Sequence, residues 1–311
     1  IRVEPGIIWT AMQDELAKHG RFVPCYPASA SFSTIGGGVA NNCSGEKTVK
    51  YGSMRDYVRS VKMIIGDGSE IEIKPLAQED LIRKQSVDSR EGEMYRGMQD
   101  LLVSNHNLIH NARLDVNKSS TGYWLWNLIS DRELNLAPLI VGSQGTLGIV
   151  TEITLRTIPK PPLTGLLLAA FDDLTKAGEA VPRLLELKPS ALEMVDKYLI
   201  EMVAAEKPEM VKMLLEGKRE ASALVLFVEF DGSDIQEIKN QISKCKMILG
   251  ELTTDCREAY DPAEQKELWS ARRSAAVIAE GAKGDKKALP FIEDSTVHPR
   301  HLAAYLVTLY K

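Results

Sequence analysis

The sequence predicts an α+β protein with two domains, and three observations lead to this prediction. The chain has 311 residues, enough for two hydrophobic cores. Residues 60–74 contain two alternating apolar runs around a Gly-Asp-Gly turn, which is typical of a β-hairpin. After the stretch TIPKPP at residues 157–162, strand-like and helix-like segments alternate. The three prolines of that stretch are expected to interrupt helix and sheet, so the predicted domains are residues 1–160 and 161–311.

The elements of the first domain are predicted from periodicity and turn signals. Apolar residues at helical spacing before Gly20 predict a helix over residues 6–20 that ends at a glycine cap. Residues 91–112 are expected to be helical. Residues 136–156 are expected to form a buried apolar run, a glycine loop and then the alternating strand Ile149–Leu155.

The second domain is expected to alternate strands and helices. In chain order these are a strand at 164–171, a helix after Asp173 that contains Pro182, a strand at 191–196, a helix to about residue 215, a strand at 223–230, and helices at 234–249 and 262–281. The last helix begins at Pro262, and proline is favoured there because the first helical position needs no N–H donor. This alternation predicts a sheet packed against helices.

Composition excludes several classes of function. A net charge of -5 argues against a nucleic-acid partner, because phosphate binding needs a basic surface. The densest apolar stretch, residues 163–171, is far shorter than the roughly 20 residues of a membrane-spanning helix. The opening IRVEPG does not resemble a secretory signal. The four cysteines show neither CxxC pairing nor a histidine at ligand spacing, so neither a disulfide framework nor a zinc site is expected. This use of cysteine predicts a reducing compartment, and the expected location is the cytoplasm.

Two glycine-rich segments raise the question of which nucleotide they hold. We call residues 33–45 the first glycine segment and residues 142–148 the second glycine loop. A Walker A loop requires lysine after its last glycine, but Glu46 follows Gly45. A Rossmann fingerprint requires G-x-G-x-x-G; the first segment has Asn41 at the third glycine position, and the second loop reads G-x-x-G-x-x-G. The two common nucleotide folds therefore do not explain these glycines.

The side chains of both segments nevertheless suit a planar ligand. Three glycines can take positive φ and leave no side chain between their backbone amides and a planar ligand, beside hydroxyl donors and amides that tolerate left-handed backbone. In the second loop, N–H groups are expected beside an apolar wall. The residues are Gly36, Gly37 and Gly38; Ser33 and Thr34; Asn41 and Asn42; and Gly145, Thr146, Ile149 and Val150. The alternative is that both stretches are tight connections between core strands.

A family resemblance rests on three motifs that occur in order along the chain. They are PCYPASASFSTIGGGVANNCSGEKTVKYGSMRDYVRSVKMIIGDGS (24–69), STGYWLWNL (120–128) and LIVGSQGTLGIVTEITLR (139–156). Together they resemble the FAD domain of the FAD-linked D-2-hydroxy-acid dehydrogenases. That group includes D-lactate dehydrogenase and the flavin subunit of glycolate oxidase, among the vanillyl-alcohol-oxidase-type flavoproteins. The resemblance implies the second part of an FAD-binding domain of that type, followed by a partial ferredoxin-like α+β substrate domain.

The resemblance also implies which residues bind FAD. Pro27 and residues 33–38 would line the isoalloxazine and ribityl part, and the second glycine loop would approach other parts of the cofactor. The residues are Pro27, Ser33, Thr34, Ile35, Gly36, Gly37, Gly38, Asn41, Asn42, Gly45, Gly142, Gly145, Thr146, Gly148, Ile149 and Val150. The stretch TGYWLWNL matches a family segment beside the flavin, but core packing is favoured for Trp124 and Trp126.

Family members carry further segments at both ends of the region matched here. A glycine-rich loop that grips the FAD pyrophosphate lies upstream of RVEPG, and a histidine-rich segment that supplies metal ligands or the catalytic base lies downstream. The chain is therefore expected to be the middle part of a flavoenzyme, and its binding of FAD by itself is expected to be weak or absent.

The family reaction needs a cation for the substrate carboxylate and a base for the hydroxyl proton. By the resemblance, Arg272 in KELWSARRS is the substrate-binding guanidinium, and a planar fork suits a carboxylate. The alternative is that Arg272 and Arg273 are surface residues paired with Glu264 or Glu267. No catalytic base is assigned, and the part played by Glu293 and Asp294 is left open.

The five histidines give no clear metal site. They are His19, His106, His110, His298 and His301. The i,i+4 spacing of His106 and His110 would place both on one helix face, as in some metal sites. Without a carboxylate motif nearby, exposed or core histidines are favoured, and no metal is expected.

The predicted function is transfer of hydride from the α-carbon of a D-2-hydroxy acid, such as D-lactate or glycolate, to FAD. One alternative is a flavoenzyme of the same superfamily that acts on another alcohol. Another is a non-catalytic flavin-binding or electron-relay subunit of a complex. The expected partners are the small 2-hydroxy-acid substrate and an iron–sulfur electron-transfer protein or fused module, through which the protein could lie at a membrane surface.

Overall fold

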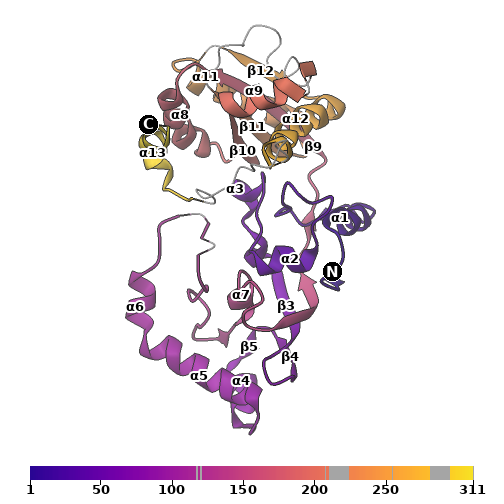
Figure 1. Cartoon of the computed structure of the whole chain (residues 1–311), viewed down its shortest axis with the longest axis vertical. Coiled ribbons are helices and arrows are strands. Elements are labelled where there is room, and N and C mark those ends of the chain that lie inside the picture. Colours follow the sequence, from indigo (N-terminus) through magenta and orange to yellow (C-terminus); the bar gives the residue numbers. More distant parts are fainter. Residues whose placement is uncertain are drawn as a thin grey trace, which may run out of the picture. The chain divides into compact units, whose positions relative to one another are not determined.

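The computed structural model describes residues 1–116, 118–119, 121–206, 208–209, 224–253, 255–280 and 295–310. The chain divides into two compact units, residues 1–160 and residues 161–311 (Figure 1). Each unit has its own sheet and its own buried core. No helix in the described ranges is long and apolar enough to cross a membrane.

Unit 1 is built on a four-stranded antiparallel sheet. Its order is β1 (Arg2–Val3), β7 (Ile149–Leu155), β3 (Val58–Ile64) and β4 (Glu70–Ile73). The predicted hairpin is confirmed, because β3 and β4 pair from Val61 with Ile73 to Ile64 with Glu70. Two small sheets accompany it, β2 (Arg21–Phe22) with β8 (Ile158–Pro159) and β5 (Leu76–Ala77) with β6 (Glu133–Leu134).

The helices of unit 1 are shorter than their sequence patterns predict. They are α1 (Trp9–Ala17), α2 (Ile35–Ala40), α3 (Thr48–Tyr51), the 3₁₀ turn η1 (Met54–Asp56), α4 (Gln78–Ser86), α5 (Arg90–Ser104), α6 (His106–Asn111) and α7 (Ala137–Ile140). The helix predicted over residues 6–20 begins only at Trp9, because Ile8 is extended and forms an isolated bridge with Thr34. The helix predicted over residues 91–112 is broken at Asn105, whose φ of -111° and ψ of 16° are not helical.

The proline stretch at residues 157–162 contains sheet structure, whereas its composition predicts none. Pro159 pairs with Arg21, and Ile158 pairs with Phe22. A two-stranded ribbon has only edge strands, and an edge strand tolerates a residue without an N–H. The side chain of Arg21 strengthens the pairing, because its Nε donates to Thr157 Oγ1 at 2.7 Å.

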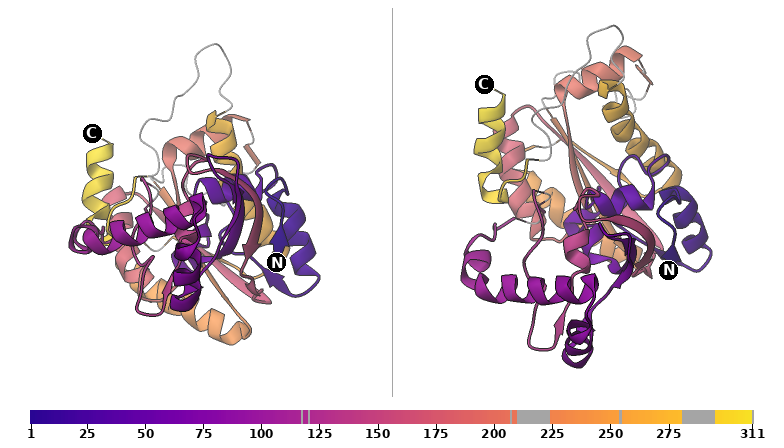
Figure 2. Two further views of the ribbon diagram at one scale, coloured as in Figure 1. Left: turned by 90° about the horizontal axis from the view of Figure 1, so that it is seen from below. Right: turned by 60° about the horizontal axis from the view of Figure 1, so that its bottom comes forward.

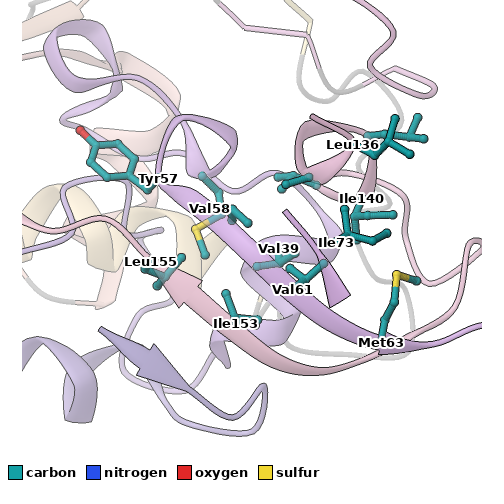
Figure 3. Packing of buried hydrophobic residues seen from close by; sticks show 14 of the residues in the cluster. Val39, Tyr57, Val58, Val61, Met63, Ile73, Leu136, Ile140, Ile153 and Leu155 are labelled. Atoms are coloured by element: carbon teal, nitrogen blue, oxygen red, sulfur yellow. The ribbon is translucent and has the colours of Figure 1, made fainter. Parts of the chain in front are cut away.

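The core of unit 1 is what fixes the two glycine segments in place. Val39 of α2 and Ile140 of α7 point into the same apolar cluster as Val61 of β3 and Ile153 of β7 (Figure 3). All four side chains are at most 4% exposed. Burial of each such side chain is worth roughly 1.5–3 kcal/mol. The helix that carries the first glycine segment and the turn that precedes the second are therefore anchored to one core.

Unit 2 has the ferredoxin-like order of elements that the resemblance implies. In chain order they are β9 (Leu163–Phe171), α8 (Leu174–Leu185), β10 (Ala191–Asp196), β11 (Leu224–Gly232), α11 (Ile235–Leu249) and β12 (Cys256–Ala259). The sheet order is β10-β11-β9-β12, with every neighbouring pair antiparallel. This is the β-α-β-β-α-β arrangement. Figure 2 shows β9 and β11 running side by side through the unit.

Helices cover both faces of this sheet, because its two long strands are apolar on both sides. Leu167, Ala169 and Phe171 pack with α8 and α11, whereas Leu166 and Leu168 pack on the other face. That second face is covered by α9 (Lys197–Glu206) and α12 (Pro262–Glu280). The turn η2 (Pro299–His301) and α13 (Leu302–Leu309) complete the unit. Residues 210–223, on which the end of the helix predicted to residue 215 falls, lie outside the described ranges.

Candidate functional site

The first glycine segment contains a helix rather than the open loop that its glycines predict. Thr34 is extended and caps α2, since its Oγ1 accepts a hydrogen bond from Gly37 N at 3.1 Å. Gly36, Gly37 and Gly38 do not use the positive φ that glycine permits, because all three lie inside α2.

Close packing, not backbone conformation, explains two of these glycines. A Cβ on Gly36 would lie 2.6 Å from Pro5 Cβ. A Cβ on Gly38 would lie 3.0 Å from Trp9 Nε1 and 3.0 Å from Cys43 Sγ. Gly37 is exposed and points away from this packing. The inner side of α2 therefore lies directly against its neighbours, while the outer side presents bare backbone.

The turn after α2 buries one amide without a full set of partners. Asn42 has the left-handed backbone expected for it, with φ of 48°, and is fully buried. Its Oδ1 accepts a hydrogen bond from Arg55 N at 3.0 Å, but its Nδ2 has no partner in the described part of the chain. A buried donor left unpaired costs about 1–3 kcal/mol. This amide is therefore poised to donate to a ligand.

Gly45 brings the end of the first segment against a second stretch of backbone. A Cβ there would lie 2.0 Å from the carbonyl oxygen of Tyr26 and 3.6 Å from Pro27 Cα. Only glycine permits this approach. Pro27, which the resemblance assigns to the flavin, is thus next to Gly45 although 18 residues separate them in the sequence.

The second glycine loop is hydrogen-bonded to the end of α2. Gly142 N donates to Val39 O at 2.9 Å, and Gln144 N donates to Ala40 O at 2.9 Å. Positive φ at Gly142 (93°), Gln144 (53°) and Gly145 (75°) turns the chain sharply here. The structure therefore brings together two glycine segments that lie about 100 residues apart in the sequence.

The loop ends on an exposed apolar residue and a pair of hydroxyl groups. Ile149 is 68% exposed at the start of β7, whereas Val150 is half-buried. Thr146 Oγ1 lies 2.7 Å from Tyr123 Oη and donates to Ser143 O at 2.6 Å. The apolar wall predicted at Ile149 is thus on the surface of unit 1.

Trp124 and Arg55 pack together at this site, and Arg55 was not singled out from the sequence. Trp124 is partly buried and packs against the core of unit 1, as favoured from the sequence, and it stands edge-on to Trp126 with ring centroids 4.8 Å apart. The guanidinium of Arg55 lies over the Trp124 ring, 4.2 Å from its centroid. No local pattern signals Arg55, because its contacts come from segments more than 60 residues further along the chain.

These features fit a planar, hydrogen-bonding cofactor. A Cβ on Gly145 would meet nothing within 4 Å, and one on Gly37 only Thr34 Oγ1 at 3.3 Å, so both backbones are open to a ligand. The Nδ2 of Asn42, directly after α2, supplies a buried donor that has no partner in the described part of the chain. The residues present therefore suit the FAD that the resemblance implies.

The predicted substrate residue of unit 2 has a different partner from those considered from the sequence. Arg272 on α12 forms an ion pair with Glu193 on β10, and the two side chains are 24% and 21% exposed. Glu264 instead pairs with Arg257, with Nη2 and Oε1 2.6 Å apart. Trp269, one turn before Arg272, packs on Phe227 with ring centroids 5.3 Å apart.

The histidines form no metal cluster in the described ranges. The rings of His106 and His110 are exposed and stack with centroids 6.3 Å apart. No group of three or more His, Cys, Asp or Glu side chains with the geometry for a metal ion was found there. Glu293 and Asp294 lie outside the described residues. The catalytic base stays unassigned.

Comparisons with known proteins connect both units to flavin enzymes. The family model described as FAD binding domain matches residues 1–74. The model described as FAD linked oxidases, C-terminal domain, matches residues 160–311. Among solved structures, alkyldihydroxyacetonephosphate synthase matches with a TM-score of 0.58 and 19% identity, over 90% of this chain and 45% of that chain. At this identity the likeness shows the fold alone.

Sequence relatives carry names that refer to 2-hydroxy acids. D-2-hydroxyglutarate dehydrogenase of Pantoea ananatis is 26% identical over 99% of this chain and 31% of its own length. D-lactate dehydrogenase of Anaerostipes hadrus is 26% identical over 88% of this chain and 47% of its own length. The glycolate oxidase subunit GlcD of Escherichia coli K12 is 29% identical over 88% of this chain and 44% of its own length. The chain thus spans a third to a half of the length of these relatives.

Proposed function

We propose that this chain belongs to the FAD-linked oxidases and is the flavin- and substrate-binding part of a D-2-hydroxy-acid dehydrogenase. The FAD binding domain model covers the first glycine segment, and the C-terminal domain model covers all of unit 2. The relatives are named for 2-hydroxyglutarate, lactate or glycolate, which share a hydroxyl group next to a carboxylate. Unit 1 would then be the FAD-binding domain and unit 2 the substrate domain.

One observation carries the proposal for unit 1, namely the joining of the two glycine segments by Gly142 N and Gln144 N. Because these two hydrogen bonds fix the second loop on the carbonyl end of α2, the two glycine segments and the Asn42 side chain would serve one ligand. The residues proposed to bind FAD are Pro27, Ser33, Thr34, Ile35, Gly36, Gly37, Gly38, Asn41, Asn42, Gly45, Gly142, Gly145, Thr146, Gly148, Ile149 and Val150.

The chemistry divides between cofactor and protein. Bound FAD would supply the acceptor for the hydride from the α-carbon of the substrate. The glycine segments would hold and orient the ring by close approach of their backbone and by the Asn42 amide. Arg272 holds the substrate carboxylate. A guanidinium has five N–H donors, so Glu193 occupies only part of its binding capacity and also fixes its orientation.

The direct test is reduction of the flavin by substrate. We expect the full-length protein that contains this chain to purify with FAD, and we expect one of D-lactate, D-2-hydroxyglutarate and glycolate to bleach the flavin absorbance under anaerobic conditions. The L-enantiomers of the chiral acids are the matched controls and should leave the spectrum unchanged. A full-length protein without flavin would contradict the cofactor assignment. A flavoprotein that none of the three acids reduces would contradict the substrate class alone.

Replacement of Arg272 by methionine tests the substrate site. We expect KM for the hydroxy acid to rise about 30-fold, because a hydrogen bond to a charged group contributes roughly 1.5–3 kcal/mol. Steady-state kinetics with the reactive acid measures the change. Arg257→Met is the matched control, since Arg257 also pairs with a glutamate on α12 but is not assigned to substrate. An equal rise in KM in both variants would mean that Arg272 acts only through the stability of unit 2.

A further inference from the structure

Arg55 ties three distant segments of unit 1 together, beginning with its own backbone. It lies in η1, immediately before β3. Its N–H donates to Asn42 Oδ1 at 3.0 Å, which orients the Asn42 amide so that Nδ2 is left without a partner in the described chain. The backbone of Arg55 is thus part of the support of the first glycine segment.

The guanidinium of Arg55 reaches the other side of the site. Nη2 donates to Val141 O at 3.1 Å, and Nε donates to Pro138 O at 3.3 Å. Nη1 donates to Ser119 O at 3.5 Å, and the group lies over the Trp124 ring. Hydrogen bonds from a charged donor are roughly twice as strong as neutral ones. One side chain therefore holds the residues immediately before the second glycine loop.

Gly142 passes directly between Arg55 and Asn42. A Cβ at this position would lie 3.3 Å from Arg55 Nη2 and 3.4 Å from Asn42 Cβ. Gly142 is also the residue whose N–H donates to Val39 O of α2. The guanidinium, the Asn42 amide and the start of the second loop consequently form one packed group.

The charge of Arg55 has no carboxylate partner within the described part of the chain. Its polar contacts there are the carbonyl groups named above. Burial lowers the pKa of the guanidinium to about 10, and the nearby Asp56 opposes this only in part. A cation that is partly buried against carbonyl oxygens and an aromatic ring, without a carboxylate, is held at a cost, which an anionic ligand nearby would offset.

We propose that Arg55 is a positioning residue of the flavin site, which holds the second glycine loop against α2 and places a positive charge beside the Asn42 amide. This inference rests on the proposed function, because it takes the two glycine segments to be the FAD site. Arg55 is absent from the residues that the family resemblance assigns to FAD. Its role follows from contacts that only the folded chain creates.

The first experiment needs no flavin. In the full-length protein, hydrogen exchange at the amides of Gly142 and Gln144 should become at least about tenfold faster in both Arg55→Gln and Arg55→Lys, since a lysine cannot bridge the separate carbonyls. Amides of the β3–β7 ladder should keep their protection, which separates loop positioning from a general loss of stability. Arg21→Lys is the matched control, because Arg21 also donates to a carbonyl, that of Thr157. Unchanged exchange at Gly142 and Gln144 would overturn the proposal.

The second experiment measures FAD affinity in the same variants. We expect the dissociation constant to rise roughly 10- to 100-fold in Arg55→Gln, less in Arg55→Lys, which keeps the charge, and not in Arg21→Lys. Faster loop exchange with unchanged FAD affinity would overturn the flavin role of Arg55 while the proposed function stands. A wild-type protein that binds no FAD would instead contradict the proposed function, and it would also contradict the inference about Arg55.

Discussion

Gly148→Ala is expected to lower the free energy of unfolding of unit 1 by roughly 2–5 kcal/mol. Gly148 has φ of 146°, a conformation that is essentially limited to glycine. A Cβ there would also lie 2.5 Å from Ile64 O and 2.5 Å from Met63 Cε. The carbonyl cannot move without disturbing the β3–β7 pairing, and Met63 is fully buried in the core. Backbone strain and overpacking therefore add at one residue.

Urea denaturation of the variant, followed by circular dichroism, measures this loss. Gly145→Ala is the control within the same loop, because Gly145 has φ of 75° but a Cβ there would meet nothing within 4 Å. It should carry only the backbone strain, about 1–2 kcal/mol. If the two variants lose equal stability, the close contact of Gly148 with β3 does not exist as described. Both variants should also weaken FAD binding, because both distort the second glycine loop.

The parts of the fold that could be predicted from the sequence depend on local patterns. The strand Ile149–Leu155 has the predicted bounds, since alternation of side chains is a property of the strand itself. The β3–β4 hairpin follows from its glycine turn, and the helix at 235–249 follows from an apolar stripe after Asp234, whose side chain caps it. In each case the signal and the structure span the same few residues.

The helix in the first glycine segment could not be predicted, because its causes lie elsewhere in the chain. Consecutive glycines disfavour a helix by about 1 kcal/mol each relative to alanine. Pro5 and Trp9, about 30 residues earlier, pack where side chains at positions 36 and 38 would stand. Tertiary contact thus requires glycine and imposes the helix at the same time. The sequence pattern singled out a candidate ligand segment but predicted a loop where the structure has a helix.

The partners of the two site arginines also lie beyond local patterns. Glu264 and Glu267 are the partners considered for Arg272 from the sequence, but the observed partner is Glu193, which precedes it by 79 residues. Arg55 has its guanidinium contacts 64 to 86 residues away. Candidate residues of the glycine segments could be named from the sequence because glycine and asparagine are themselves informative. An arginine is common on any surface, so only its three-dimensional contacts single it out.

The position of Arg272 depends on how α12 packs on the sheet. Trp269 lies three residues before Arg272, so the two side chains project from neighbouring points of one helix face. Trp269 is 5% exposed and rests on Phe227, which is fully buried in the middle of β11. Glu193, the partner of Arg272, stands on β10 directly opposite Phe227 in the strand pairing. One phenylalanine therefore supports both the helix and the strand that hold the arginine.

Replacement of Phe227 by alanine is accordingly expected to cost unit 2 about 3–5 kcal/mol of unfolding free energy, the usual range for a buried aromatic side chain. The cavity beneath Trp269 should also loosen the Arg272–Glu193 pair, so that KM for the hydroxy acid rises as well. Urea denaturation and steady-state kinetics of the full-length protein measure the two effects. Met247→Ala on α11, where the side chain is 79% exposed, should change stability by less than about 0.5 kcal/mol and leave KM unaltered. A large loss of stability in Phe227→Ala with unchanged KM would show that the arginine does not depend on this packing, because Trp269 would then hold its place without the ring beneath it.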